Sequence, residues 1–126
     1  MNKNVIIQSF LYAINGITHG FKTQRNLRFH LFATVIVFLF AWLLHVSLIE
    51  TGILILTCMI VISLELINTA IENVVDICSE KKLLSAAKYA KDISAGAVLI
   101  SATGAVIIGI IIFLPYMMNL IHYLFQ

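Results

Sequence analysis

Charged residues are scarce in this chain of 126 residues, where Asp, Glu, Lys and Arg together make up 11% of the sequence. A typical soluble domain carries roughly 25%. Hydrophobic residues make up 61%, and the mean hydropathy is +1.03. A soluble fold of about this length buries only about two-thirds of the surface that its unfolded chain exposes, so it would leave too much apolar surface in water. The composition excludes an ordinary soluble domain and a nucleic-acid-binding tail, and it predicts a domain embedded in a lipid bilayer.

Cysteine and glycine are too few or too scattered to build several familiar kinds of site. The two cysteines, Cys58 and Cys78, give no disulfide framework, and no Cys/His cluster has the spacing of a zinc site. The six glycines form neither the G-x-x-x-x-G-K-[ST] phosphate-binding loop nor the G-x-G-x-x-G dinucleotide fingerprint. The motifs of soluble protein kinases are also missing. These absences exclude the common soluble nucleotide-binding folds.

Three apolar runs cover 31–49, 52–77 and 95–114. A bilayer core of ~30 Å needs about 20 helical residues, so each run predicts a membrane-spanning helix. Pro115, the only proline, is expected to end the third helix. Residues 3–21 show a weaker pattern of apolar and polar positions three and four apart, which is typical of an amphipathic helix at a membrane surface. We expect an all-α membrane protein with three transmembrane helices and an N-terminal surface helix, forming one domain over 1–126.

The basic residues indicate how the chain is oriented in the membrane. Four precede the first span, namely Lys3, Lys22, Arg25 and Arg28, and four lie between the second and third spans, namely Lys81, Lys82, Lys88 and Lys91. By the positive-inside rule, the N-terminus and the 78–92 loop lie in the cytoplasm and the C-terminus lies outside. Lysines in such a loop can simply meet anionic headgroups. For Lys91, which is next to Asp92, we favour a contact with phosphate.

The third span carries small residues at intervals of four, at Ala97, Ser101, Ala105 and Gly109. Such a stripe lets another helix approach closely. We therefore expect tight helix packing along this face.

The second span has an unusual polar face, formed by Glu65, Asn68, Thr69, Glu72 and Asp76. At 100° per residue these side chains share an arc of about 100°, although a charge within a bilayer costs several kcal/mol. We interpret this face as a polar cleft open to the cytoplasm. Carboxylates near the interface suit Mg²⁺, which prefers oxygen ligands and substrate phosphates, and the deeper Glu65 suits a proton acceptor. The alternative is a structural network in which the acids pair with lysines of a neighbouring helix.

Residues 65–76, ELINTAIENVVD, closely resemble the signature of the prokaryotic diacylglycerol kinase family, E-x-x-N-[ST]-A-x-E-x-x-V-D. The segments 90–92 (AKD) and 95–98 (AGAV) are similar to its second block. The resemblance covers about 9–115, and the segments 25–30 (RNLRFH) and 113–115 (FLP) look like its Gram-positive branch. That branch is implied to be undecaprenol kinase. The resemblance also implies a homotrimer with active sites at the subunit interfaces.

The resemblance implies roles for individual residues. Glu65 matches the general base, and Glu72 matches a carboxylate that binds the Mg²⁺ held by ATP. The expected ATP-binding residues are Tyr12, Asn68, Glu72, Asp76, Glu80, Lys81, Lys82, Lys91 and Asp92. Asn26 and Arg28 are expected to contact the lipid together with Glu65. The family usually has a metal-binding glutamate where this chain has Gln24; an uncharged amide oxygen would hold the ion more weakly.

These observations lead to one expected function and to rivals. We expect ATP- and Mg²⁺-dependent phosphorylation of a membrane lipid alcohol, undecaprenol, in a bacterial cell membrane. Diacylglycerol is the alternative acceptor, because both lipids present a primary hydroxyl. A proton-coupled transporter is a rival of another class, since transporters also place carboxylates within the membrane. It leaves Lys91 and Asp92 unexplained. A purely structural membrane protein is a third possibility.

Overall fold

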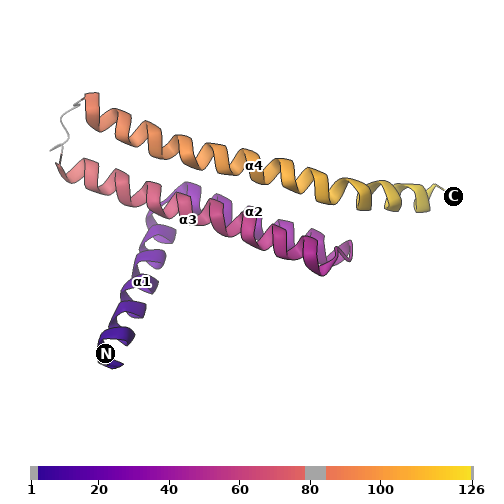
Figure 1. Ribbon diagram of the computed structural model, residues 1–126, viewed down its shortest axis with the longest axis horizontal. Helices are drawn as coiled ribbons and strands as arrows, with labels where there is room; N and C mark the ends of the chain where they lie inside the picture. The colour runs from indigo at the N-terminus through magenta and orange to yellow at the C-terminus, as the bar shows by residue number, and fades with distance from the viewer. Residues whose placement is uncertain (1–2, 79–84, 126) are drawn as a thin grey trace.

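The computed structural model describes residues 3–78 and 85–125, and these residues form four α-helices and no strand. The helices are α1 (Lys3–Thr23), α2 (Arg25–Leu43), α3 (Leu48–Cys78) and α4 (Ser85–Leu124). The last three are long and apolar enough to cross a membrane. They run along one another, whereas α1 leaves the bundle at a steep angle (Figure 1). The expected all-α architecture with three spans and a separate N-terminal helix is confirmed.

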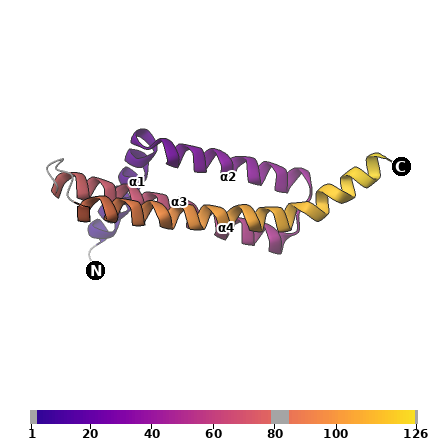
Figure 2. The same cartoon turned by 90° about the horizontal axis from the view of Figure 1, so that it is seen from above.

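The central helix of the bundle is α3, which packs against α4 along most of its length and against α2 on another side. Viewed from above, α2 and α4 lie apart over much of the bundle (Figure 2). They approach each other where the rings of Phe40 and Phe113 lie 6.5 Å apart, edge to face. We call this part of the bundle the Glu50 end and the opposite part, where α3 finishes, the Asp76 end.

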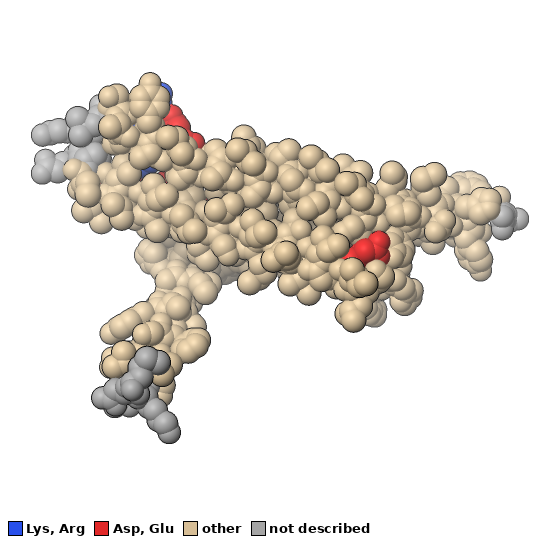
Figure 3. Space-filling view, in the orientation of Figure 1, with Lys and Arg blue, Asp and Glu red and all other residues tan. Residues whose placement is uncertain are grey.

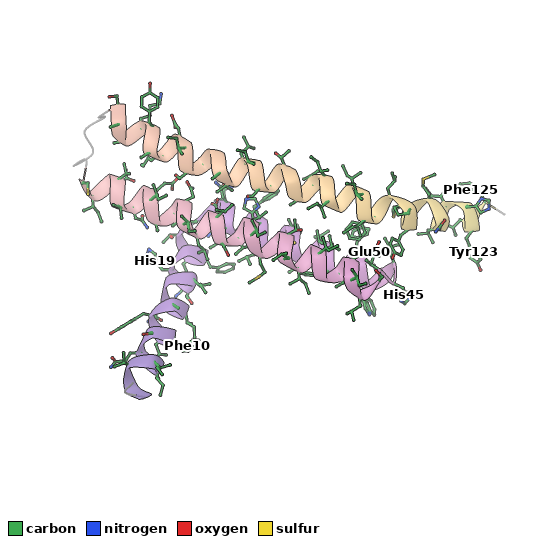
Figure 4. All side chains as sticks on the ribbon, in the orientation of Figure 1. Phe10, His19, His45, Glu50, Tyr123 and Phe125 are labelled. Carbon is green, nitrogen blue, oxygen red and sulfur yellow. The ribbon has the colours of Figure 1, made fainter. Side chains whose placement is uncertain are left out.

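The angle of α1 depends on Gly20, which is buried where α1 meets α2 and α3. A Cβ atom added at Gly20 would lie 3.1 Å from the side chains of both Leu27 and Leu66, so a glycine permits this close crossing. One residue, Gln24, then breaks the helix with an extended backbone before α2 begins. Phe10 lies on α1 away from the bundle, whereas His19 lies near the point where α1 meets it (Figure 4). The exposed Phe10 is as expected for a surface helix whose apolar side rests on lipid.

The boundaries of the first two spans differ from the expected 31–49 and 52–77. Helix α2 ends at Leu43, because His45 has a φ of 53°, in the left-handed region that ends a helix. Helix α3 then begins with a capping box. The amide of Glu50 donates to Ser47 Oγ at 3.4 Å, and the amide of Ser47 donates to Glu50 Oε2 at 3.3 Å. Residues 46–49 therefore belong to the turn and to the start of α3.

The expectation that Pro115 ends the third span is wrong, because α4 continues through Pro115 to Leu124. Within a membrane, neighbouring groups can compensate the backbone hydrogen bond that a proline removes. Figure 2 shows that the C-terminal part of α4 bends away from the bundle axis, as a proline kink would produce. The next residue anchors the helix there: the Tyr116 hydroxyl donates to Glu50 Oε2 at 2.6 Å.

The surface of the bundle is that of a protein surrounded by lipid. Most large apolar side chains are exposed, and the apolar core that groups Ala41, Leu54 and Ile112 is small and lies towards the Glu50 end. On the face drawn in Figure 3, coloured acidic and basic atoms appear towards the ends of the bundle, and the middle is free of them. The stripe of small residues does not pack closely within one chain: Gly109 has open space where a Cβ would be, and Ala97 is exposed.

Candidate active site

Helix α3 carries the polar face that the sequence predicts, and the side chains on this face become more accessible towards the Asp76 end. Glu65, Asn68 and Thr69 are all buried, with exposed fractions of 2%, 5% and 6%. Glu72 is half-buried, and the Asp76 side chain is 57% exposed. The face therefore leads from the open Asp76 end to a buried carboxylate about 16 Å further along the helix axis.

Asn68 is the centre of a hydrogen-bond network between α3 and α4. Its amide Oδ1 accepts a hydrogen bond from Ser94 Oγ at 2.6 Å, and its Nδ2 donates to Glu72 Oε1 at 3.1 Å. Ser94 Oγ also lies 2.9 Å from the carbonyl oxygen of Lys91, so its single hydrogen is shared between the two acceptors. The amide of Asn68 thus fixes the Glu72 carboxylate and joins it to α4. Ser94 was not anticipated, although it lies three residues after Lys91 on the same face of its helix.

At the open end, Lys91 Nζ pairs with Asp76 Oδ1 at 2.5 Å. For this outermost acid, the alternative of pairing with a lysine of a neighbouring helix is correct. The pair is partly exposed, with a Lys91 side-chain exposure of 35%, and exposed pairs contribute little to stability. An incoming phosphate can therefore compete for the Lys91 ammonium at small cost.

Glu65 has a different environment. No hydrogen bond joins its carboxylate to another side chain among the described residues. Thr69 Oγ1 donates to its backbone carbonyl at 3.0 Å. Its titratable neighbours are His30 and Glu72. Placing a carboxylate in a largely buried position costs free energy. Such a group is characteristic of a functional site.

The donors at the open end fit a divalent cation such as Mg²⁺. Glu72 and Asp76 are four residues apart, so their carboxylates share one face of α3. Within the described residues there is no group of three His, Cys, Asp or Glu side chains that would form a closed metal site. Mg²⁺ is usually held by one or two carboxylates, with waters and substrate phosphates completing the shell.

The structure does not bring every expected site residue to this face. Tyr12 is 71% exposed on α1, and Gln24 lies at the junction of α1 and α2. Asn26 and Arg28 are exposed on the first turn of α2, where Arg28 donates to the carbonyl of Lys22 at 3.3 Å and so ties the two helices. Asp92 is exposed near Lys91, and Glu80, Lys81 and Lys82 lie outside the described residues. The roles expected for all of them stay predictions.

An apolar groove of about 490 Å³ runs along α3 between α2 and α4. Its walls include Val37 on α2, Leu54 and Val61 on α3, and Ala105 and Phe113 on α4. It extends from the level of His30 towards the Glu50 end. Sequence periodicity did not predict it, because the groove depends on how far α2 and α4 are separated.

The fold and site together define a small helical membrane protein in which an acidic helix face leads to an apolar groove. Comparison with known proteins identifies the class more closely. The family model described as prokaryotic diacylglycerol kinase matches residues 11–113. This chain belongs to that family of membrane lipid kinases.

Two curated relatives are similar over most of this chain. A protein named diacylglycerol kinase from Synechocystis sp. is 45% identical over 115 residues, which cover 91% of this chain and 66% of the relative. A protein named undecaprenol kinase from Bacillus subtilis is 43% identical over 112 residues, which cover 89% of this chain and 90% of the relative. The chain thus spans about two-thirds of the length of the first relative. The two names agree on lipid kinase activity and differ in the lipid.

Proposed function

We propose that this protein transfers the γ-phosphoryl group of ATP to the hydroxyl of a membrane lipid alcohol, and that the acceptor is undecaprenol. The observation that carries the proposal is the position of Glu65, a buried carboxylate without a side-chain hydrogen bond in the described residues, at the inner end of the polar face. A lipid in the bilayer can approach this depth laterally. ATP reaches the opposite, open end of the same face.

In the proposed reaction the lipid hydroxyl gives its proton to Glu65 while its oxygen attacks the γ-phosphorus. The new oxygen–phosphorus bond forms as the bond to the bridging oxygen breaks, and ADP leaves. Mg²⁺, which Glu72 would hold, would supply charge neutralisation at the phosphates. Phosphoryl transfer depends mainly on positioning and electrostatics, and Asn68 supports both because it holds the Glu72 carboxylate.

Undecaprenol is preferred to diacylglycerol as the acceptor because of the resemblance to the Gram-positive branch and the relative from Bacillus subtilis. The relative from Synechocystis supports diacylglycerol as the second candidate. The catalytic residues do not discriminate between two primary hydroxyls. The deciding experiment is incubation of the purified protein in detergent with labelled ATP, Mg²⁺ and each lipid. Faster labelling of diacylglycerol would overturn the choice of undecaprenol, and no labelling of either would overturn the kinase function.

We also propose a bacterial cell membrane as the location, with the Asp76 end in the cytoplasm and the C-terminus outside. This orientation is supported by the described basic residues of the bundle, because Arg25 and Arg28 begin α2 and Lys88 and Lys91 begin α4. A homotrimer is proposed as the working assembly, and the proposal is supported by the resemblance of residues 65–76 to the family signature. Tyr12, Gln24, Asn26 and Arg28 would complete the site if a neighbouring subunit contributes them.

A further inference from the structure

His30 on α2 lies at the point where the apolar groove meets Glu65. Leu27, which is 1% exposed, fixes this part of α2 against the crossing of Gly20 and Leu66. His30 follows Leu27 by three residues and therefore shares its inward face. Helices α2 and α3 are antiparallel. His30, which lies one turn after Leu27 on α2, is therefore level with the residues one turn before Leu66 on α3, towards the Glu50 end.

Two observations confirm that His30 faces this region. It is half-buried and lines the groove together with Val61 of α3, and Glu65 follows Val61 by four residues on the same helix face. Among the described titratable groups, His30 and Glu72 are the neighbours of Glu65. The imidazole therefore stands between the apolar groove and the buried carboxylate.

Neither of these two polar groups has its side-chain hydrogen bonds satisfied within the described residues. Thr34 Oγ1 donates to the backbone carbonyl of His30 at 2.8 Å, and the His30 ring packs edge to face against Phe29 at 5.7 Å between centroids. No hydrogen bond within the described residues uses its ring nitrogens. The Glu65 carboxylate is similarly without a side-chain donor. The described residues contain no buried side-chain nitrogen or oxygen without a partner, so the polar atoms of Glu65 and His30 keep some accessible surface that a ligand can reach. The hydroxyl group of a lipid alcohol would give each of the two side chains a hydrogen-bond partner, since it accepts one hydrogen bond and donates another.

We propose that His30 is a second group at the acceptor hydroxyl: its ring N–H donates a hydrogen bond to the hydroxyl oxygen while Glu65 receives the hydroxyl proton, and the adjoining chain of the lipid lies in the groove. This inference rests on the proposed kinase function and deepens it. The imidazole stays unchanged through the reaction. It holds one lone pair of the hydroxyl oxygen and thereby directs the other towards the γ-phosphorus. Misplacement of a reacting atom by about 1 Å can cost ~10²-fold in rate.

The test compares His30→Leu with His30→Gln, which keeps an N–H donor at a similar reach. The purified proteins are assayed in detergent for kcat, for KM towards the lipid alcohol and for ATP affinity. We expect His30→Leu to lower kcat about 10–100-fold with lipid KM and ATP affinity within about threefold of wild type. His30→Gln should recover most of the lost rate. The matched control is His45→Asn at the Glu50 end, because asparagine tolerates the left-handed backbone of His45; it should leave kcat unchanged.

Several results would overturn the inference while the kinase function stands. One is a His30→Leu variant that keeps its kcat while the wild type is active. Another is a His30→Gln variant that is as slow as His30→Leu. The third is a change that affects only the KM for the lipid. If the Leu variant does not fold, His30→Asn replaces it: its amide is one bond shorter, so it should be several-fold slower than the Gln variant, and equal rates would contradict the donor role. A wild type that phosphorylates no lipid alcohol overturns the kinase function itself, and the inference with it.

Discussion

Ser94 Oγ on α4 donates a hydrogen bond of 2.6 Å to the amide Oδ1 of Asn68 on α3. Both residues are buried, with exposed fractions of 8% and 5%. The bond fixes the rotational register of the two helices at the depth where the acidic face becomes buried. It also orients the Asn68 amide so that its Nδ2 points to Glu72.

Ser94→Ala should therefore destabilise the protein and impair the site. It leaves the buried Oδ1 of Asn68 without its donor, which costs about 1–3 kcal/mol, and it frees the amide to rotate away from Glu72. We expect a lower melting temperature in detergent and weaker MgATP binding. Thr103→Val is the control, because Thr103 is exposed on the same helix and its hydroxyl bonds only to the Leu99 carbonyl of that helix in the described structure. Equal behaviour of the two variants would contradict the role of the Ser94–Asn68 bond.

Tyr116→Phe should separate stability from activity. It removes the hydroxyl that bonds Glu50 Oε2 at 2.6 Å and accepts from the Ser47 amide at 3.2 Å, so α4 loses its tie to the start of α3. We expect the melting temperature to fall by a few degrees while kcat changes less than twofold, because these groups lie at the opposite end from the acidic face. The control is Tyr123→Phe, whose side chain is on the exposed end of α4. A large loss of kcat with no change in melting temperature would show that the Glu50 end takes part in turnover.

The polar face of α3 was predictable because helical periodicity alone brings residues 65–76 together. The period of 3.6 residues places Glu65, Asn68 and Glu72 on one side, and the observed burial confirms that side as the interior. The capping box at 47–50 was also legible in the sequence as S-x-x-E. The expected start of the second span, residue 52, is four residues later than the observed start at Leu48, which follows this box.

Other features depend on relations between helices that no single segment encodes. Ser94 meets Asn68 only because α4 has one particular register against α3. The apolar groove exists because α2 and α4 both contact α3 and lie apart from each other. Helix α4 continues through Pro115 because, within a membrane, neighbouring groups can compensate the backbone hydrogen bond that a proline removes. The rule that a proline ends a helix comes from soluble proteins and does not include this effect.

Glu72→Gln should abolish turnover and weaken MgATP binding. The substitution keeps the shape of the side chain and an acceptor for Asn68 Nδ2, which now lies 3.1 Å away, but removes the negative charge that would hold the ion. Nucleotide binding measured with and without Mg²⁺ checks the reason for the loss. We expect the Mg²⁺-dependent part of the affinity to fall and the rest to persist. Unchanged MgATP affinity in a folded variant would rule out the metal role.

Gln24→Glu should preserve or raise activity. The variant restores the charge that the family usually has at this junction between α1 and α2, where the Gln24 side chain makes no capping hydrogen bond. A carboxylate there should lower the Mg²⁺ concentration needed for half-maximal rate. Titration of activity with Mg²⁺ in both proteins measures this directly. A clear loss of activity in a folded variant would show that this chain uses the glutamine in another way.

Glu65→Gln should block phosphoryl transfer to lipid while MgATP still binds. Glutamine keeps the size of the buried side chain and one acceptor oxygen, but it does not take up a proton at neutral pH. Glu65 lies about two turns deeper than Glu72 along α3, away from the open end that would receive ATP. Loss of a general base typically lowers the rate ~10²–10⁴-fold. Lipid phosphorylation and nucleotide affinity should be measured on the same preparation. A rate loss below tenfold would mean that Glu65 is not the base. A parallel collapse of nucleotide affinity would assign Glu65 to the ATP site instead, and the proton acceptor would have to be another residue near the groove.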